Sequence, residues 1–336
     1  DNRNPASPRI AGFVELIGNE DLSIKDDKLY ADSYVDLVWF DISDPERPEL
    51  EGRVENAFRY ALPTIENGFD YNMCYSEEAR AKGVVVGWEP KEREETIYHY
   101  PSYGGDLMAN DAAPGTSTQG VNGSMARFSI YGKYLYTVEQ NVMCVFDLSG
   151  DKPVLTTNDI WLQRGVETLF NYKDKMFMGT PTGMLIYSLE DPLAPKYRSS
   201  VSHVFGCDPV VVEDDLAYVT VHSGNTCGQN TNELMLIDVS DVDQPNLLVT
   251  YGMKCPKGLG IDNGTLFLCD EGLKVFNAKD PMTLLANQLV HYAGMEGYDV
   301  IPFRNTLMMI ADDGLYQYDY SNLQAISQLS KLPMGE

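Results

Sequence analysis

The run Leu37-Val38-Trp39-Phe40-Asp41, with the turn Ser43-Asp44-Pro45 directly behind it, decides the fold of this chain. Apolar, β-branched and aromatic residues favour a strand, and Ser-Asp ahead of Pro favours a turn. Similar short runs that end in a small polar residue recur along the sequence, so we predict a strand followed by a turn at each. The other runs are Met143–Asp147, Met184–Ser188, Met235–Asp238, Leu273–Asn277 and Leu315–Asp319.

The spacing of these runs predicts the architecture. Upstream of each run lies a pair of short strands joined by a polar turn. The first apolar residues of the second strands are separated by 106, 41, 40, 50 and 41 residues. A period near 41 with four short strands is typical of a β-propeller blade, so we predict an all-β propeller with four antiparallel strands per blade, in a single domain over residues 1–336. These first apolar residues are Leu29, Leu135, Met176, Leu216, Leu266 and Leu307.

The 106-residue interval is about two periods plus a surplus. We interpret residues 57–121 as a degenerate blade that carries a long loop insertion, which gives seven blades. The alternative is six blades with an insertion. Residues 8–17 resemble an outer strand, and we expect them to pair with the last blade, close the ring and cover its exposed edge.

The charge of the chain excludes two classes of partner. It has 25 Lys and Arg against 50 Asp and Glu, a net charge of −25. Such a protein repels nucleic-acid phosphates and anionic membrane surfaces. No stretch approaches the roughly 18 apolar residues of a membrane-spanning helix. We expect no nucleic-acid partner, no transmembrane segment in this chain, and a monomer.

One set of polar residues is predicted to line the mouth of the central channel. Eight residues before each anchoring residue, the innermost strand begins, and three of these six positions are aspartates. Three interpretations stay open: the carboxylates hold a hard cation such as calcium, they raise one another's pKa and supply a general base, or they cap backbone N–H groups at strand starts. Arg127 argues against a pure metal ring, because it can neutralise neighbouring carboxylates. The candidate ligand-binding residues are Asp21, Arg127, Glu167, Thr168, Asp208 and Asp299, and the candidate calcium ligands are Asp21, Asp208 and Asp299.

A second set of short polar residues ends the apolar runs, directly before the turns. Short polar side chains at such positions bond the turn backbone, so we predict a structural role for them. They are Asp41, Asp147, Ser188, Asp238, Asn277 and Asp319.

The cysteines suggest one disulfide. Cys207 begins an innermost strand, and Cys227 follows the neighbouring antiparallel strand, so both fall at one edge of a blade. A Cys207–Cys227 bridge would imply an oxidising compartment. The alternatives are a zinc site with His203 and His222, or free thiols. Cys255 and Cys269 have a similar but weaker relation.

The apolar run ending in Asp, followed by Ser-Asp-x-x-x-Pro, resembles the LVIVD repeat of bacterial and archaeal surface-associated β-propellers, and the resemblance covers roughly residues 8–330. It implies a propeller fold but no particular activity. Members are typically exported, often as lipoproteins. We therefore expect export to the bacterial periplasm or outer cell surface, with a lipid anchor on a removed N-terminal segment.

Two functional hypotheses follow. The first is a non-enzymatic cell-envelope propeller that binds a small polar or glycan ligand, or a protein, at the acidic mouth. The alternative is a calcium-dependent hydrolase or lactonase of a sugar-like substrate, in which Asp21, Asp208 and Asp299 hold the cation and Glu167 is the base. A third interpretation, purely architectural, treats the carboxylates as strand-start caps.

Overall fold

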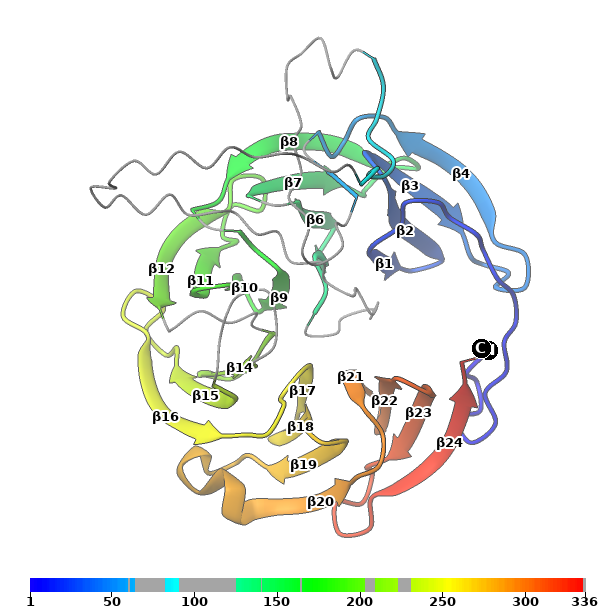
Figure 1. Cartoon of the computed structure of the whole chain (residues 1–336). Coiled ribbons are helices and arrows are strands. Elements are labelled where there is room, and N and C mark those ends of the chain that lie inside the picture. Colours follow the sequence, from blue (N-terminus) through cyan, green and yellow to red (C-terminus); the bar gives the residue numbers. More distant parts are fainter. Residues whose placement is uncertain are drawn as a thin grey trace.

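The computed structural model describes residues 1–59, 61–63, 82–90, 125–139, 141–163, 165–202, 209–222 and 231–334. These residues form six four-stranded antiparallel sheets, the blades, arranged around a central axis (Figure 1). Blade 1 holds β1 (Leu22–Lys25), β2 (Lys28–Ser33), β3 (Asp36–Asp41) and β4 (Glu49–Val54), and blade 2 holds β5 (Phe128–Tyr131), β6 (Tyr134–Glu139), β7 (Val142–Asp147) and β8 (Val154–Trp161). Blade 3 holds β9 (Thr168–Tyr172), β10 (Lys175–Thr180), β11 (Gly183–Ser188) and β12 (Lys196–Ser202), and blade 4 holds β13 (Val210–Glu213), β14 (Leu216–Val221), β15 (Glu233–Asp238) and β16 (Asn246–Gly252). Blade 5 holds β17 (Leu259–Asp262), β18 (Thr265–Cys269), β19 (Leu273–Asn277) and β20 (Gln288–Tyr292), and blade 6 holds β21 (Gly297–Phe303), β22 (Thr306–Ala311), β23 (Gly314–Asp319) and β24 (Ser327–Pro333).

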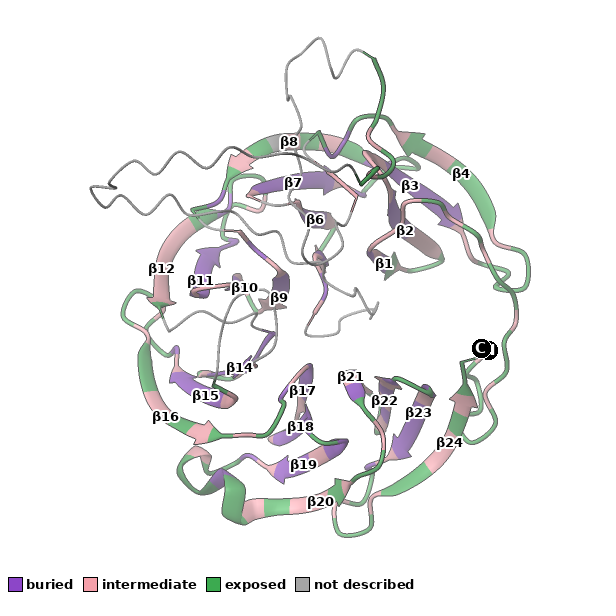
Figure 2. Ribbon diagram, viewed as in Figure 1, coloured by how far each residue is buried: buried purple, intermediate pink, exposed green. Residues whose placement is uncertain are grey.

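The predicted all-β propeller with four antiparallel strands per blade is confirmed. Each strand pairs with the next one along the chain, so every blade is a simple meander. The predicted apolar runs are the third strands, and their residues are largely buried, whereas the outermost strands are half-buried or exposed (Figure 2). A 3-10 helix, η1 (Pro281–Asn287), connects β19 to β20. No helix in the described part of the chain has the length and apolar character that a membrane crossing requires.

The polar residues that end the third strands have the predicted structural role. In blade 1 the Ser43 N–H donates to Asp41 Oδ1 at 2.7 Å, and in blade 4 the Ser240 N–H donates to Asp238 Oδ1 at 2.9 Å. The same bond from the residue two positions later recurs at Asp147, Ser188, Asn277 and Asp319. These side chains thus fix the turn between the third and fourth strands in all six blades.

The structure has six blades, and the prediction of seven was wrong. The innermost strands β1 and β5 are direct neighbours, because the Phe128 N–H at the start of β5 donates to Asp21 Oδ2 at 3.0 Å. The buried Phe58 fills the same junction, with its ring centroid 5.9 Å from that of Phe128. No blade can therefore lie between blades 1 and 2. Of the predicted degenerate blade, residues 57–121, the described parts contain no strand, and the rest lies outside the described residues.

The N-terminal segment differs from the strand expected over residues 8–17. It contains no strand, and β24 pairs with β23 as the outer strand of blade 6. β24 therefore takes the outer-strand position of blade 6 that was expected for residues 8–17. The segment runs instead along the outside of the ring from blade 6 to blade 1 (Figure 1).

Candidate functional site

Asp21 joins the inner ends of blades 1 and 2. It precedes β1 and is only 5% exposed. Its Oδ1 accepts the Leu22 N–H at 2.7 Å, and its Oδ2 accepts the N–H groups of Arg127 and Phe128, the latter at 3.0 Å. Burial raises the pKa of Asp21 to about 6, although the hydrogen bond from the Arg127 backbone and the Arg127 charge oppose this. The geometry matches the strand-start cap anticipated from the sequence, extended to the neighbouring blade.

Asp32 on β2 holds the segment that enters blade 1. Its Oδ1 accepts three hydrogen bonds, from Asn19 Nδ2 at 2.7 Å, from the Glu20 N–H at 2.8 Å and from the Asp21 N–H at 2.9 Å. Asp32 is buried, and burial raises its pKa. These bonds fix the backbone of Glu20 and so aim its side chain toward blade 2.

Arg127 is the cation at the centre of this carboxylate group. Its guanidinium pairs with Glu20 of blade 1, and its Nη1 lies 4.0 Å from Glu139 Oε2 at the end of β6. Burial opposes the positive charge of Arg127, but Glu139 and Glu20 outweigh it and raise the pKa of the guanidinium. The four carboxylates Glu20, Asp21, Asp32 and Glu139 thus surround one arginine, an excess of negative charge when all are ionised.

Glu139 is the least compensated member of this group. Its side chain is 20% exposed, and the Arg127 guanidinium at 4.0 Å is its ion-pair partner. Burial raises the pKa of Glu139 to about 7, Arg127 opposes the shift, and the charges of Glu20 and Asp32 add to it. A carboxyl with this pKa exchanges its proton near neutral pH, which suits it for binding a cation or for acid–base chemistry.

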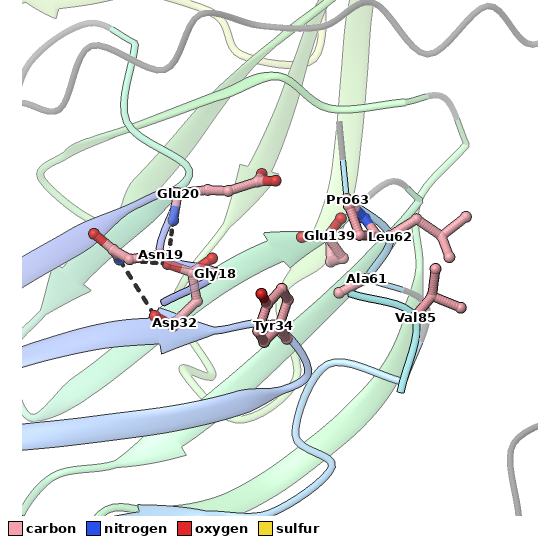
Figure 3. Close-up of a pocket in the computed structure, with 10 residues that line it drawn as sticks. All are labelled: Gly18, Asn19, Glu20, Asp32, Tyr34, Ala61, Leu62, Pro63, Val85 and Glu139. Atoms are coloured by element: carbon pink, nitrogen blue, oxygen red, sulfur yellow. Dashed lines mark hydrogen bonds between the residues drawn. The ribbon is translucent and has the colours of Figure 1, made fainter. Parts of the chain in front are cut away.

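These side chains open onto a pocket of about 260 Å³ between blades 1 and 2 (Figure 3). The blade 1 wall carries Glu20, Asp32 and the Tyr34 ring, and the facing wall carries Glu139 of blade 2 beside mostly apolar residues (Figure 3). Figure 3 shows Glu20, Asp32 and Tyr34 on the blade 1 side, opposite residues 61–63 and Val85. The lining residues are Gly18, Asn19, Glu20, Asp32, Tyr34, Ala61, Leu62, Pro63, Val85 and Glu139.

Of the other predicted mouth residues, the described ones lie on blades away from this pocket. Asp299 begins the inner part of blade 6, is 1% exposed, and its Oδ1 accepts the Val300 N–H at 2.9 Å. A Cβ at Gly258 would come within 2.2 Å of Asp299 Oδ1, which explains the glycine at the equivalent position of blade 5. Thr168 is buried, and the Glu167 N–H donates to the Gly179 carbonyl at 2.9 Å.

The predicted register of blade 4 was off by one residue. In blade 1 the Asp32 N–H donates to the Asp21 carbonyl, and in blade 4 the corresponding bond runs from the Thr220 N–H to the Pro209 carbonyl. Pro209 is therefore the equivalent of Asp21. The apolar Leu216 at the start of β14 misled the alignment, because it stands where blade 1 has Lys28. Asp208 itself lies outside the described residues. The ring position therefore carries two aspartates, Asp21 and Asp299, and not three.

The predicted disulfide and zinc alternative cannot be placed. Cys207, Cys227 and His203 lie outside the described residues. Cys255 and Cys269 are free thiols, the first exposed and the second buried. Within the described ranges, no group of three or more His, Cys, Asp or Glu side chains is arranged to hold a metal ion.

Sequence reasoning missed Glu139 and Asp32, although a signal for Glu139 exists. Glu139 is the last residue of a second strand, where blades 1, 3, 4 and 6 have Ser33, Thr180, Val221 and Ala311. In blade 5 the equivalent residue, directly after β18, is the buried Asp270, so blades 2 and 5 carry a carboxylate at this position and the other four do not. Comparing the ends of the second strands, and not only the starts of the first, would have found it.

Comparison with known proteins identifies the repeat. The sequence model of the LVIVD repeat matches residues 20–56 and 208–252. The chain is a β-propeller that carries LVIVD repeats. No curated protein matches the sequence.

Solved structures share the propeller fold at low sequence identity. A candidate 6-phosphogluconolactonase from Bacteroides fragilis has a TM-score of 0.57 at 9% identity, covering 96% of this chain and 86% of the other. The periplasmic gluconolactonase of Pseudomonas aeruginosa has a TM-score of 0.55 at 12% identity, covering 94% and 85%. The computationally designed protein Ika8 has a TM-score of 0.51 at 11% identity, covering 95% and 87%. These likenesses concern the fold alone.

Proposed function

We propose that this LVIVD-repeat propeller is a non-enzymatic binding protein whose ligand is a small organic cation, such as a protonated amine with an apolar substituent, held in the pocket between blades 1 and 2. The observation that carries the proposal is the Glu139 carboxylate, which faces the pocket while Arg127, 4.0 Å away, is already paired with Glu20. An ammonium group beside Glu139 would supply the charge that this carboxylate lacks.

The remaining walls suit the same ligand class. The Tyr34 ring offers a π face to a cation, and such contacts contribute about 0.5–2 kcal/mol. The apolar side chains of Ala61, Leu62 and Val85 would cover an alkyl or aromatic substituent. A neutral glycan would use Asn19 and Tyr34 but would leave Glu139 uncompensated, so the charge of the pocket favours the cation.

Isothermal titration calorimetry with butylamine, and with butanol as the neutral control, tests this proposal. We expect the amine to bind and butanol not to, with an affinity that increases from pH 6 to pH 8 as Glu139 loses its proton. The variant Glu139→Gln should abolish amine binding, whereas Glu190→Gln, at an exposed position in blade 3, should not. Equal affinity for amine and alcohol, or unchanged binding in Glu139→Gln, would contradict the proposal.

A second candidate function is hydrolysis of a lactone in the same pocket. The pKa of Glu139, raised to about 7, favours it, because a carboxylate poised at neutral pH can take a proton from water. The water oxygen would then bond to the lactone carbonyl carbon to give a tetrahedral oxyanion. The ring C–O bond would break with return of the proton to the leaving oxygen, giving a hydroxy acid. Titration of acid released from gluconolactone tests this, and Glu139→Gln should lower kcat about 100-fold or more.

Calcium binding through Asp21, Asp208 and Asp299 stays a prediction. Both carboxylate oxygens of Asp21 accept backbone N–H groups, so a calcium ion would compete with these bonds. Thermal unfolding after EDTA treatment and after calcium addition is the test, since a bound ion raises Tm by mass action. A rise in Tm that is lost in Asp208→Asn would support the calcium-dependent hydrolase.

We also propose that the protein acts outside the cytoplasm, at the cell envelope. The support is the LVIVD repeat and its resemblance to exported propellers. Fractionation of the producing cells, with detection of the native protein in periplasmic, membrane and cytoplasmic fractions, tests it.

A further inference from the structure

Five of the six junctions between blades are closed by apolar cores that the two blades share. The cluster between blades 2 and 3 contains Tyr136, Met143, Met176 and Leu185, for example. Comparable clusters join blades 1 and 2, blades 3 and 4, blades 4 and 5, and blades 5 and 6. Each of these junctions therefore excludes water over two sheet faces.

The sixth junction, between blades 6 and 1, is built differently, and we call it the seam. None of the core clusters formed by the described residues contains side chains from both blades. On blade 6, the face toward blade 5 buries Leu307 and Met309, but the alternate residues Met308 and Ile310 of β22 are only half-buried. On blade 1, Val14 and Leu16 of the N-terminal segment, residues 1–17, pack against the face toward the seam, and we call this segment the strap.

The strap contacts blade 6 through polar groups. Asn2 Nδ2 donates to Gln317 Oε1 at 2.8 Å, and Gln317 Nε2 donates back to Asn2 Oδ1 at 2.8 Å. The Pro5 carbonyl accepts hydrogen bonds from Gln317 Nε2 at 3.2 Å and from Ser330 Oγ at 2.6 Å. Gln317 is fully buried, so the strap satisfies a buried amide on this blade.

The strap contacts blade 1 through an ion pair and two apolar side chains. Arg9 Nη2 lies 2.7 Å from Glu46 Oε1, and Val14 and Leu16 pack against the apolar face of the blade. Other large apolar side chains of the strap face solvent: Phe13 is 88% and Ile10 is 71% exposed. The strap thus buries little apolar surface compared with a shared blade core.

The end of the strap continues into the pocket. The Ile17 carbonyl accepts a hydrogen bond from Ser33 Oγ at 3.0 Å, and the Gly18 carbonyl accepts the Tyr34 N–H at 2.9 Å. Gly18 has a φ of +72°, and a Cβ there would lie 2.5 Å from the Tyr34 ring. Gly18 and Tyr34 both line the pocket, so the position of the strap sets one of its walls.

We propose that the strap is a releasable closure of the ring: its detachment opens the seam between blades 6 and 1 and at the same time removes the Gly18 wall of the pocket. The inference goes beyond the proposed function, because it concerns how the ring is closed whatever the pocket binds. Local opening with a free energy below that of global unfolding is expected where few apolar contacts hold an element.

Hydrogen–deuterium exchange of Leu16→Asp, with Phe13→Asp as the matched control, tests the proposal. Both variants place a carboxylate on the strap, but Leu16 packs on blade 1 whereas Phe13 is exposed. In Leu16→Asp we expect exchange about tenfold faster or more in blade 1 and also in β22 and β23 of blade 6, with β10 and β14 unchanged. Faster exchange confined to blade 1, equal acceleration in all six blades, or no difference from Phe13→Asp would overturn the proposal.

The unmodified protein supplies a second test, which holds even if Leu16→Asp does not fold. Native-state exchange at low denaturant concentrations should show the amides of β2 and β22 exchanging at least about tenfold faster than those of β10 and β14. Uniform protection across the six blades would overturn the proposal. Neither measurement uses a ligand, so its result is independent of whether the pocket binds an amine.

Discussion

Blade 1 has two neighbours, and different interactions hold its two junctions together: apolar packing on one side and mainly polar contacts on the other. Toward blade 2 it shares an apolar core with the buried rings of Phe58, Phe128 and Phe146, and Asp21 adds hydrogen bonds between the innermost strands. Toward blade 6 it meets the strap, which brings two half-buried apolar side chains, an exposed ion pair and a set of amide hydrogen bonds. Apolar burial contributes about 25 cal/mol per Å², whereas exposed ion pairs contribute little, so the first junction is the stronger.

The difference in strength between the two junctions indicates where the molecule can hold a binding site. The carboxylates around Arg127 repel one another, and such an arrangement persists only where the surroundings are rigid. The junction of blades 1 and 2 provides that rigidity, and the pocket lies there. The seam lies on the other face of the same blade and is held more weakly, and the strap that closes it leads into the Gly18 wall of the pocket.

The largest loss of stability is expected from a substitution in the apolar core between blades 1 and 2. Phe58→Ala removes a ring that is 3% exposed and packs 6.1 Å from the Phe146 ring, so it should lower the free energy of unfolding by about 3–5 kcal/mol. Urea unfolding followed by tyrosine and tryptophan fluorescence measures it. Phe13→Ala, on the exposed strap side, should change stability by less than about 0.5 kcal/mol. Equal losses in the two variants would show that Phe58 is not part of the junction core.

The second largest expected effect is a change in folding stability with pH, and the raised pKa of Glu139 determines its direction. Because the pKa of Glu139 is raised from 4.5 to about 7 in the folded protein, protonation of this group favours the folded state. Its contribution is fully present below pH 4.5 and is lost as pH rises through 7, by about 3 kcal/mol at most. The stability of the natural protein should therefore fall relative to Glu139→Gln over this range.

Urea unfolding of both proteins between pH 4.5 and pH 8 is the measurement. The difference between them reports the titration of Glu139 together with its coupling to Glu20 and Asp32, because the remaining titrating groups are common to both. Glu190→Gln, exposed in blade 3, should show a difference that does not vary with pH. A difference between the natural protein and Glu139→Gln that stays constant with pH would contradict the raised pKa.

A smaller effect tests the polar bridge between the innermost strands. Asp21→Ala leaves the N–H groups of Arg127 and Phe128 without their acceptor, and an unsatisfied buried donor costs about 1–3 kcal/mol. We expect a loss of about 2 kcal/mol by chemical denaturation. Asp159→Ala, at an exposed position on β8, is the matched control and should be close to neutral. If both variants are neutral, Asp21 does not join the blades.

The fold could be predicted from the sequence because each blade repeats the same local signals. The apolar third strand recurs in all six blades, and so does the short polar residue that bonds the turn two residues later, an Asp in four blades; these are local patterns. The number of blades could not be predicted in this way, because residues 57–121 are long enough for a blade and a loop but contain no clear copy of the repeat. What decides it is the contact of Asp21 with Phe128, which lies 107 residues away in the sequence.

The candidate site could be predicted only in part, for a related reason. The ring of strand starts led to Asp21 and Arg127, which the structure brings together. Glu139 and Asp32 belong to second strands, and their role arises only because blade 2 packs directly on blade 1. The misplaced register at Leu216 shows the same limit, since one apolar residue at a polar position shifts the whole set by one residue.

The smallest expected effect tests the weaker junction. Asn2→Ala removes both amide hydrogen bonds to Gln317 while the Pro5 carbonyl still accepts from that side chain, so the loss should be about 1 kcal/mol. Asn4→Ala changes an exposed strap residue whose Oδ1 accepts only the nearby Ala6 N–H, and it serves as the control. Differential scanning calorimetry should show a lower Tm for Asn2→Ala only. A loss as large as that of Phe58→Ala would mean that polar bonds hold the seam as firmly as the apolar core holds the opposite junction, and the contrast between the two sides of blade 1 would have to be abandoned.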